Sequence, residues 1–273
     1  MRTQKIKHIL IDSAEIRLED GKFICLPGDR RPTRTAGGGL LGKVQDYLKG
    51  MGNLYYALLG LFSPVYAGRS TRLLKKILSQ YDTKGIILNI GSGPKRLMQR
   101  EDIINLDFFA FDEVDIVADA TNIPIRDGSV DLIINLALLE HIPNPTAVIR
   151  EIERLLKPGG AVFCFVPFMQ PFHAAPEDYY RWTYKGAKAL FEGFDNLQVT
   201  VVQGPASSFL WLSIEFWAIL LSFGSKTLHD IIFLSLMVIA SPLKLLDGLL
   251  LRFPNAEKIA GGFCITATKR GDG

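Results

Sequence analysis

Short apolar runs alternate with mixed polar segments along most of residues 85–270, and the runs are rich in β-branched residues. The runs read, in order, GIILNI, DIINLD, VDIVADA, SVDLIIN, AVFCFVP, LQVTVVQ and GFCITATK. Runs that are apolar throughout and separated by helical segments are typical of parallel strands buried on both faces. The pattern therefore predicts an α/β fold with a doubly wound, Rossmann-like sheet that is mostly parallel.

One helix within this region has clear sequence boundaries. Residues 146–157, TAVIREIERLLK, place their apolar side chains on one side of a helix. Asn144 suits the N-cap and Pro145 the first turn, while the Pro-Gly-Gly at 158–160 ends the helix. A shorter helix is expected at residues 184–191.

The pattern divides the chain into four parts. Residues 1–39 are expected to form a small hairpin around Asp20-Gly21 and a Pro/Gly-rich linker. Residues 40–84 are expected to form N-terminal helices at 40–62 and 70–80. The core comprises 85–204 and 261–270, and residues 205–260 form an apolar helical insertion between the last two strands.

Composition narrows the class of protein. The formal net charge is only +3, and no long Lys/Arg run forms a stripe, which argues against a nucleic-acid partner. Cys25, Cys164 and Cys264 lie far apart, and the N-terminal residues carry charges where a signal peptide needs an apolar core. A disulfide framework or zinc ribbon is therefore not indicated, and a cytoplasmic location is expected.

Glycines and polar residues gather where successive strands end. Gly91 and Gly93 follow the first strand, Asp107 ends the second, Asp119 lies near the end of the third, and Asn135 ends the fourth. In such sheets ligands bind at the carboxyl ends of the strands. An acid after the second strand is suited to accept hydrogen bonds from both hydroxyls of a ribose, which indicates a nucleoside ligand.

The serial pattern LNIGSGP, NLD, VADATNIPIRDGSVDLIINLALLEHI and LLKPGG closely resembles the class I S-adenosylmethionine-dependent methyltransferases that act on small molecules. The resemblance covers about residues 86–202 and the last strand, and it implies that this last strand is antiparallel. It also implies S-adenosylmethionine as the cofactor, with a binding site made of Asn89, Gly91, Ser92, Gly93, Asp107, Asp119, Ala120, Asn135 and Leu136.

The resemblance further implies a role for each part of this site. The glycines would line the methionine half of the cofactor, Asp107 would take the ribose hydroxyls, and Asp119 would face the adenine. The family commonly has an acid where Asn89 stands, and an amide lacks the charge that attracts the ammonium group.

The acceptor side of the site is predicted from two histidines and an aromatic segment. His141 follows the fourth strand in LLEHIP, and His173 lies in PFMQPFHAAPEDYYRWTYKG after the fifth. Either can act as the base for a hydroxyl acceptor; His141 can equally serve in packing or helix capping. The aromatic segment resembles one in bacterial methyltransferases of saccharide and lipid-linked pathways, which implies substrate contacts from Asp178, Tyr179 and Arg181. A packed lid is the alternative, and no metal site is expected.

The insertion is strongly apolar. Ser208, Glu215 and Ser222 form a narrow polar stripe at heptad spacing, and an uncharged run lies between Asp230 and Lys244. Glu215, Asp230 and Lys244 interrupt the apolar runs and argue against a simple transmembrane anchor. Peripheral membrane contact through 208–252 at the inner face, a homodimer surface, or a lid over a lipidic acceptor remain open.

The sequence thus favours a methyltransferase that acts on a hydroxyl of a small or lipid-linked acceptor. A nicotinamide-dependent oxidoreductase is the first alternative, but Arg96 stands where a dinucleotide fingerprint needs its third glycine. The YxxxK at 184–188 matches a short-chain dehydrogenase motif, yet the three-glycine loop of that family is missing. The second alternative is an inactive, membrane-associated binding protein of the same fold, supported by Asn89.

Overall fold

The computed structural model describes residues 2–11, 16–26, 58, 60–94, 96–97, 100, 102–173 and 177–271. The strands are β1 (Arg17–Glu19), β2 (Lys22–Ile24), β3 (Ile87–Ile90), β4 (Ile103–Asp107), β5 (Ile116–Val117), β6 (Val130–Leu136), β7 (Leu156–Pro167), β8 (Asp195–Gln203) and β9 (Gly262–Thr268). The helices outside the insertion are α1 (Arg2–Ile9), α4 (Gly68–Leu78), η3 (Leu139–His141), α5 (Pro145–Leu155) and α6 (Tyr184–Ala189).

All strands of the described residues belong to one sheet, with the order β1-β2-β5-β4-β3-β6-β7-β9-β8. Neighbouring strands are parallel to one another in the run β5, β4, β3, β6 and β7. Strand β9 pairs antiparallel with both β7 and β8. The predicted Rossmann-like sheet with an antiparallel last strand is therefore confirmed. The seven apolar runs correspond to β3 through β9.

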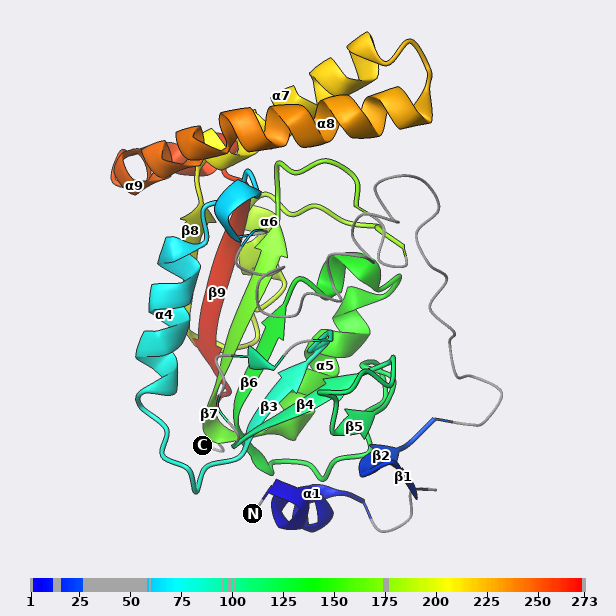
Figure 1. The fold of residues 1–273 in the computed structure, drawn as a ribbon. Helices are drawn as coiled ribbons and strands as arrows, with labels where there is room; N and C mark the ends of the chain where they lie inside the picture. Colours follow the sequence, from blue (N-terminus) through cyan, green and yellow to red (C-terminus); the bar gives the residue numbers. More distant parts are fainter. Residues whose placement is uncertain are drawn as a thin grey trace.

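Helices cover both faces of the sheet (Figure 1). On one face α5 buries Val148, Ile152 and Leu155 against β6 and β7, and its N-cap is Asn144, as predicted. On the other face α4 packs Leu74 and Leu78 against β3 and β6. Because both faces are covered, each central strand is apolar on both sides, which is why the sequence shows runs rather than alternation.

The N-terminal part differs from its prediction in two ways. Residues 2–9 form helix α1, which the sequence analysis did not anticipate. The hairpin around Asp20-Gly21 is present, but β2 pairs parallel with β5, so the hairpin extends the central sheet instead of standing apart. Within 102–173, β4, β5 and β6 are joined by segments without a helix, so the winding is incomplete there. The helix expected at 40–62 falls largely outside the described residues.

The insertion is a layer of helices: α7 (Pro205–Leu221), α8 (Lys226–Ala240), η4 (Ser241–Leu246), α9 (Asp247–Leu250) and η5 (Ala256–Ile259). Strand β8 ends at Gln203, immediately before α7, and β8 has the same direction as β7. The layer therefore lies across the end of the sheet where the parallel strands have their carboxyl ends (Figure 1). It covers the edge at which ligands of such sheets bind.

Within the layer, the polar stripe of α7 faces inward. Ser208 and Ser222 are buried, and Glu215 pairs with His229 of α8 at 3.0 Å. The wide apolar side of α7 faces outward, where Phe209, Phe216 and neighbouring side chains are exposed. This orientation inverts the usual arrangement of a surface helix and leaves an exposed apolar surface on the described part of the protein.

Two buried charges hold the insertion in place, one by joining its two ends and the other by joining it to residues 60–63. Asp247 is fully buried and accepts hydrogen bonds from the backbone N–H groups of Gly204, Ala206 and Ser207 at the start of α7, and from the Ser207 hydroxyl. Lys244 donates to the carbonyl oxygens of residues 60, 61 and 63 at 2.7–2.8 Å. The first turn of α7 thus has its free donors satisfied by a carboxylate from the end of the same layer.

We expect Asp247→Ala to lower the free energy of unfolding by about 3 kcal/mol, because it leaves several buried donors without an acceptor. Asp247→Asn retains one side-chain oxygen and should lose less. Urea denaturation followed by circular dichroism measures both. An alanine variant within about 0.5 kcal/mol of the wild type, the range of ordinary surface substitutions, would contradict this account of the helix start.

Candidate active site

The glycine loop after β3 has a backbone shape that requires glycine. Gly91 and Gly93 have φ angles of 72° and 65°, in the left-handed region. The N–H groups of Gly91 and Ser92 both donate to the carbonyl of Leu106 on β4. A Cβ at Gly91 would lie 2.9 Å from Leu138, whereas one at Gly93 would have nothing within 4 Å. The loop is packed tightly on one side and leaves space beside Gly93.

Asp107 ends β4 next to this space. Its carboxylate accepts hydrogen bonds from the N–H groups of Gly93 at 2.8 Å and Phe109 at 2.9 Å, one at each oxygen. Burial raises the pKa of Asp107, and the backbone N–H donors oppose that rise. Each carboxylate oxygen can accept more than one hydrogen bond. The arrangement fits a ribose, since both oxygens keep acceptor capacity for its two hydroxyls.

Asp119 and Ala120 follow β5 and form a tight turn. The N–H and hydroxyl of Thr121 both donate to one oxygen of Asp119, at 2.8 and 2.7 Å. Asp119 is half-buried and Ala120 is buried. The turn holds the carboxylate at the edge of the sheet, one strand away from Asp107.

The two amides predicted for the site are bonded within the sheet. Asn89 is buried on β3 and donates to the side-chain oxygen of Asn105 on β4 at 3.1 Å. Asn135 is buried on β6, donates to the carbonyl of Ile90 at 3.3 Å and accepts from the Cys164 thiol at 3.5 Å. Both amides therefore hold neighbouring strands together. Contact of Asn89, Asn135 and Leu136 with a cofactor stays a prediction.

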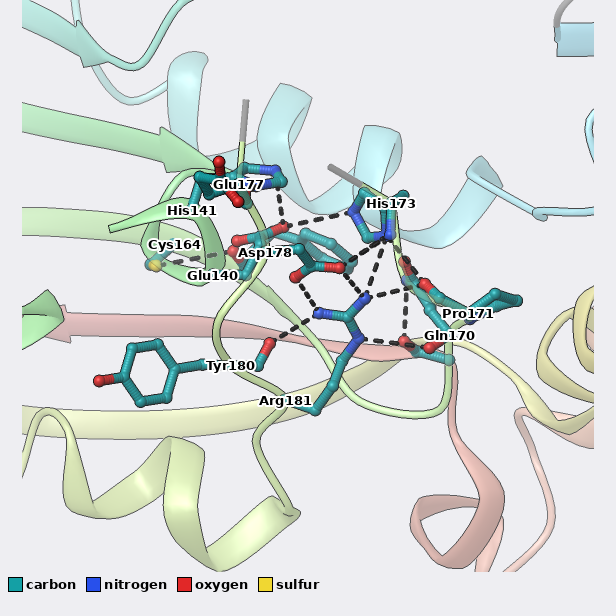
Figure 2. A network of polar contacts seen from close by, with 12 residues as sticks. Glu140, His141, Cys164, Gln170, Pro171, His173, Glu177, Asp178, Tyr180 and Arg181 are labelled. Atoms are coloured by element: carbon teal, nitrogen blue, oxygen red, sulfur yellow. Dashed lines mark hydrogen bonds and ion pairs between the residues drawn. The ribbon is translucent and has the colours of Figure 1, made fainter. Parts of the chain in front are cut away.

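Figure 2 shows that the two candidate bases lie together. His141 is on η3, directly after β6, and His173 is in the segment after β7; their ring centroids are 5.5 Å apart. His173 also stacks on Trp211 of α7, with 5.8 Å between the ring centroids. His141 and Trp211 of the apolar insertion thus both lie next to His173, on the side of the site that is predicted to hold the acceptor.

Glu140 is a residue that sequence reasoning missed. It is fully buried, and among the described residues neither carboxylate oxygen has a hydrogen-bond partner. One of these oxygens lies 3.9 Å from Nε2 of His141 and 4.0 Å from Nε2 of His173. Burial raises the pKa of Glu140 to about 7. The only sequence signal was its position beside His141 in LLEHIP, since burial cannot be read from residue type.

Asp178 and Arg181 are paired with each other. The guanidinium binds both carboxylate oxygens, at 2.5 and 2.6 Å, and the backbone N–H of His173 donates to the same carboxylate at 2.8 Å. Burial would raise the pKa of Asp178, but these donors hold it at about 2. The pair therefore braces the loop that carries His173. Tyr179, half-exposed next to it, is the member of the predicted substrate set that is open to a ligand.

Comparison with known families settles what kind of domain this is. Residues 94–164 match the family model described as "Methyltransferase domain". The match runs from the loop after β3 into β7 and includes Asp107, Asp119 and Asn135. Over residues 94–164 the chain is a methyltransferase domain of the class I, S-adenosylmethionine-dependent kind. The predicted family and the predicted cofactor are confirmed for this domain.

Curated relatives resemble the methyltransferase domain over part of its length. A ubiquinone biosynthesis O-methyltransferase of Xanthomonas oryzae is 40% identical over 68 residues, which are 25% of this chain and 26% of that protein. A protein with the same description from Nitrosococcus oceani is 33% identical over 94 residues, covering 33% and 37% of the two chains. The chain thus spans well under half of the length of these relatives.

Solved methyltransferase structures are similar to this chain at low identity and with TM-scores below 0.5. Phosphoethanolamine N-methyltransferase 2 of Haemonchus contortus has a TM-score of 0.49 and 16% identity, over 75% of this chain and 53% of that one. The 1,6-didemethyltoxoflavin-N1-methyltransferase of Burkholderia thailandensis has a TM-score of 0.45 and 14% identity, over 94% and 100%. The assignment of the domain rests on the family match and the sheet topology.

Proposed function

We propose that the protein methylates a hydroxyl group of a lipid-linked acceptor at a membrane surface, with S-adenosylmethionine as methyl donor. One observation carries the choice of acceptor. The apolar insertion lies over the side of the site that is predicted to hold the acceptor. Its helix α7 contacts the candidate base His173 through Trp211. Trp211 therefore places the apolar insertion next to the candidate catalytic residues.

The cofactor half of the proposal depends on the strand ends. S-adenosylmethionine supplies a methyl group on a sulfonium that leaves as a neutral thioether. Asp107 would accept hydrogen bonds from the ribose hydroxyls, and Gly93 would allow close approach, because nothing lies within 4 Å of its Cβ position. Asp119 and Ala120 would border the adenine. These residues orient the donor, and orientation supplies much of the rate of such transfers.

The acceptor half depends on the two histidines. Burial lowers the pKa of His173, so its imidazole is neutral near neutral pH and able to take a proton. His141 lies beside it and is held by the carbonyl of Glu177 at 2.5 Å. His173 would accept the proton of the acceptor hydroxyl as the oxygen attacks the methyl group, and His141 would help to fix its position.

The apolar surface of the insertion is large and bordered by positive charge. Most exposed large hydrophobic side chains of the described residues lie in the insertion, and Phe223 and Ile239 are 89% and 74% exposed. The exposed charges of 205–260 are basic, namely Lys226, Arg252 and Lys258. The acids of this segment are buried (Asp230 and Asp247) or half-buried (Glu215 and Glu257). Apolar contact with basic flanks fits the headgroup region of an anionic bilayer.

The structure also bears on how the insertion would meet the bilayer. Residues Lys226–Leu250 form one continuous helical stretch of 25 residues that contains an 18-residue segment with a mean hydropathy of 1.8, long and apolar enough by these criteria to cross a membrane. However, Lys244 and Asp247 within it bind the protein through buried polar contacts. Withdrawing both from those partners into lipid would be costly. We therefore propose that the helix lies in the interface, on the inner face of the membrane.

A methyl-labelled donor tests the proposed function. The purified protein is incubated with labelled S-adenosylmethionine and either a total lipid extract or a water-soluble extract of the same cells. We expect label in the organic phase, and a decrease of about 100-fold in His173→Gln, the range that loss of a general base produces. Label found only with water-soluble acceptors would contradict the lipid-linked substrate, and a homodimer would then be the better account of the apolar surface.

A further inference from the structure

We infer that Glu140, His141 and His173 form a binding site for a divalent transition-metal ion of the zinc class, with a coordination position left for the acceptor oxygen. No metal site is expected from the sequence, because nothing in the spacing of these residues along the chain indicates one. The juxtaposition arises only in the folded protein, where η3 and the segment after β7 meet (Figure 2).

The distances suit a shared ion. One ligand atom from each residue lies within 4.8 Å of the others, and the carboxylate oxygen is 3.9 and 4.0 Å from the two Nε2 atoms. Zinc ligands at about 2.0–2.2 Å in a tetrahedral arrangement lie roughly 3.4 Å apart. The carboxylate and the two imidazoles would have to approach by about half an ångström, and a pair of ligand atoms at the 4.8 Å limit by about 1.4 Å, which side-chain torsions can provide.

Both imidazoles already have the orientation of metal ligands. Nδ1 of His141 lies 2.5 Å from the carbonyl oxygen of Glu177, and Nδ1 of His173 lies 3.1 Å from that of Pro171. A carbonyl can only accept, so each Nδ1 carries the proton and each Nε2 has a free lone pair. A ligating histidine that donates its other N–H to a carbonyl is the usual outer-shell arrangement of metal sites.

The neighbouring guanidinium does not disturb this assignment. Nη2 of Arg181 also lies 3.1 Å from Nδ1 of His173, but its two hydrogens have closer acceptors. These are the carbonyl of Pro171 at 2.8 Å and the carboxylate of Asp178 at 2.6 Å. Nδ1 of His173 is therefore free to donate to Pro171, and the charge of Arg181 is balanced by Asp178 rather than by Glu140.

The independent argument for a cation is the environment of Glu140. Its carboxyl group is fully buried, and among the residues that the structure describes neither oxygen has a hydrogen-bond donor. A buried polar group without a partner costs free energy, and a metal ion bound at one or both oxygens would remove that cost. Two imidazoles and one carboxylate are ligands of zinc and iron sites, whereas magnesium and calcium favour oxygen ligands alone.

The role of this ion rests on the proposed function. With an ion bound, His173 would be a metal ligand in place of the base, because its Nε2 lone pair would be taken up by the metal. An acceptor hydroxyl bound to the metal would lose its proton more readily, and the proton would pass to solvent. Its oxygen would then form the new C–O bond while the C–S bond of the donor breaks and the sulfur keeps the electron pair. Three protein ligands leave a tetrahedral ion one position for that oxygen, as in catalytic zinc sites.

Metal binding can be measured without any acceptor. The chelator-treated full-length protein is titrated with Co²⁺ and followed by visible ligand-field absorption, and with Zn²⁺ by calorimetry. We expect one equivalent to bind. Glu140→Gln and His173→Gln should each weaken binding by more than about 100-fold, above the loss caused by an outer-shell partner. His229→Gln, a histidine paired with Glu215 in the insertion, is the matched control and should bind as the wild type does.

Binding of S-adenosylhomocysteine to each variant reports whether the domain is folded and keeps the metal result separate from the proposed function. Cobalt absorption that is absent, or that survives in both Glu140→Gln and His173→Gln, would overturn the metal site. If Glu140→Gln fails to fold, the comparison of His173→Gln with His229→Gln decides alone. A metal site with no methyl transfer to lipid would contradict the proposed function and leave the site intact.

Discussion

Asp107→Ala should weaken S-adenosylhomocysteine binding by about 100- to 1000-fold. The proposed ribose contacts are two hydrogen bonds to one charged group, and such bonds contribute about 1.5–3 kcal/mol each. A loss of about 3–4 kcal/mol corresponds to that change in the dissociation constant. Isothermal titration calorimetry of wild type and variant measures it directly.

The controls for this prediction follow from the contacts of Asp107. Asp107→Asn keeps an acceptor but loses the charge, so it should fall between the wild type and the alanine variant. Because Asp107 also holds the N–H groups of Gly93 and Phe109, thermal unfolding must show that each variant is folded. Asp112→Ala removes an exposed acid nearby and should bind normally. Equal affinity of folded Asp107→Ala and wild type would place the ribose elsewhere.

Replacing Phe216, Trp217 and Phe223 together by serine should release the protein from anionic vesicles. These side chains are 58%, 48% and 89% exposed on the insertion. Each replacement should remove about 1 kcal/mol of favourable contact with lipid, which is a fraction of the free energy gained when such a side chain is fully buried. The three replacements together should weaken binding to the vesicles by about 100-fold. Sedimentation with vesicles of anionic phospholipid measures the bound fraction, while S-adenosylhomocysteine binding should not change.

Point substitutions are the sharper test here because deletion of 208–252 would damage the rest of the site. It would remove Trp211 from His173 and Asp247 from the start of α7. The matched control is Leu18→Ser, at an apolar residue that is 61% exposed on β1, far along the sheet from the insertion. Unchanged vesicle binding in the triple variant would contradict membrane contact. If light scattering then showed a dimer that the variant loses, the surface would be a subunit interface.

The parallel sheet could be predicted because its strands are buried on both faces. A strand such as β3, with every position buried, is apolar except for the hydrogen-bonded Asn89, and this leaves a signal in the sequence alone. The start of α5 could also be predicted, because Asn144 and Pro145 specify it without help from distant residues. In contrast, the pairing of β2 with β5 depends on residues far apart in the chain, so the sequence could not show that the hairpin joins the sheet.

In the candidate site, too, some residues are placed by local sequence and others by contacts between distant segments. Asp107 and Asp119 follow strands that were recognised, so their place at the edge of the sheet could be expected. The burial of Glu140 and its contact with His173 depend on how the segment after β7 folds back over η3, through contacts such as the N–H of Tyr179 to the carbonyl of Glu140. Spacing in the sequence cannot reveal that. The heptad stripe of α7 was visible, but which side of it faces the protein was not.

The central claim is that the carboxyl ends of β3, β4 and β5 bind S-adenosylmethionine. The most direct test is calorimetric titration of the wild-type protein with S-adenosylhomocysteine and, in parallel, with NADH. The account predicts that S-adenosylhomocysteine binds with one site per chain and that NADH gives no heat of binding. Binding of NADH without S-adenosylhomocysteine would contradict the account and favour an oxidoreductase, and binding of neither would favour an inactive protein of the same fold.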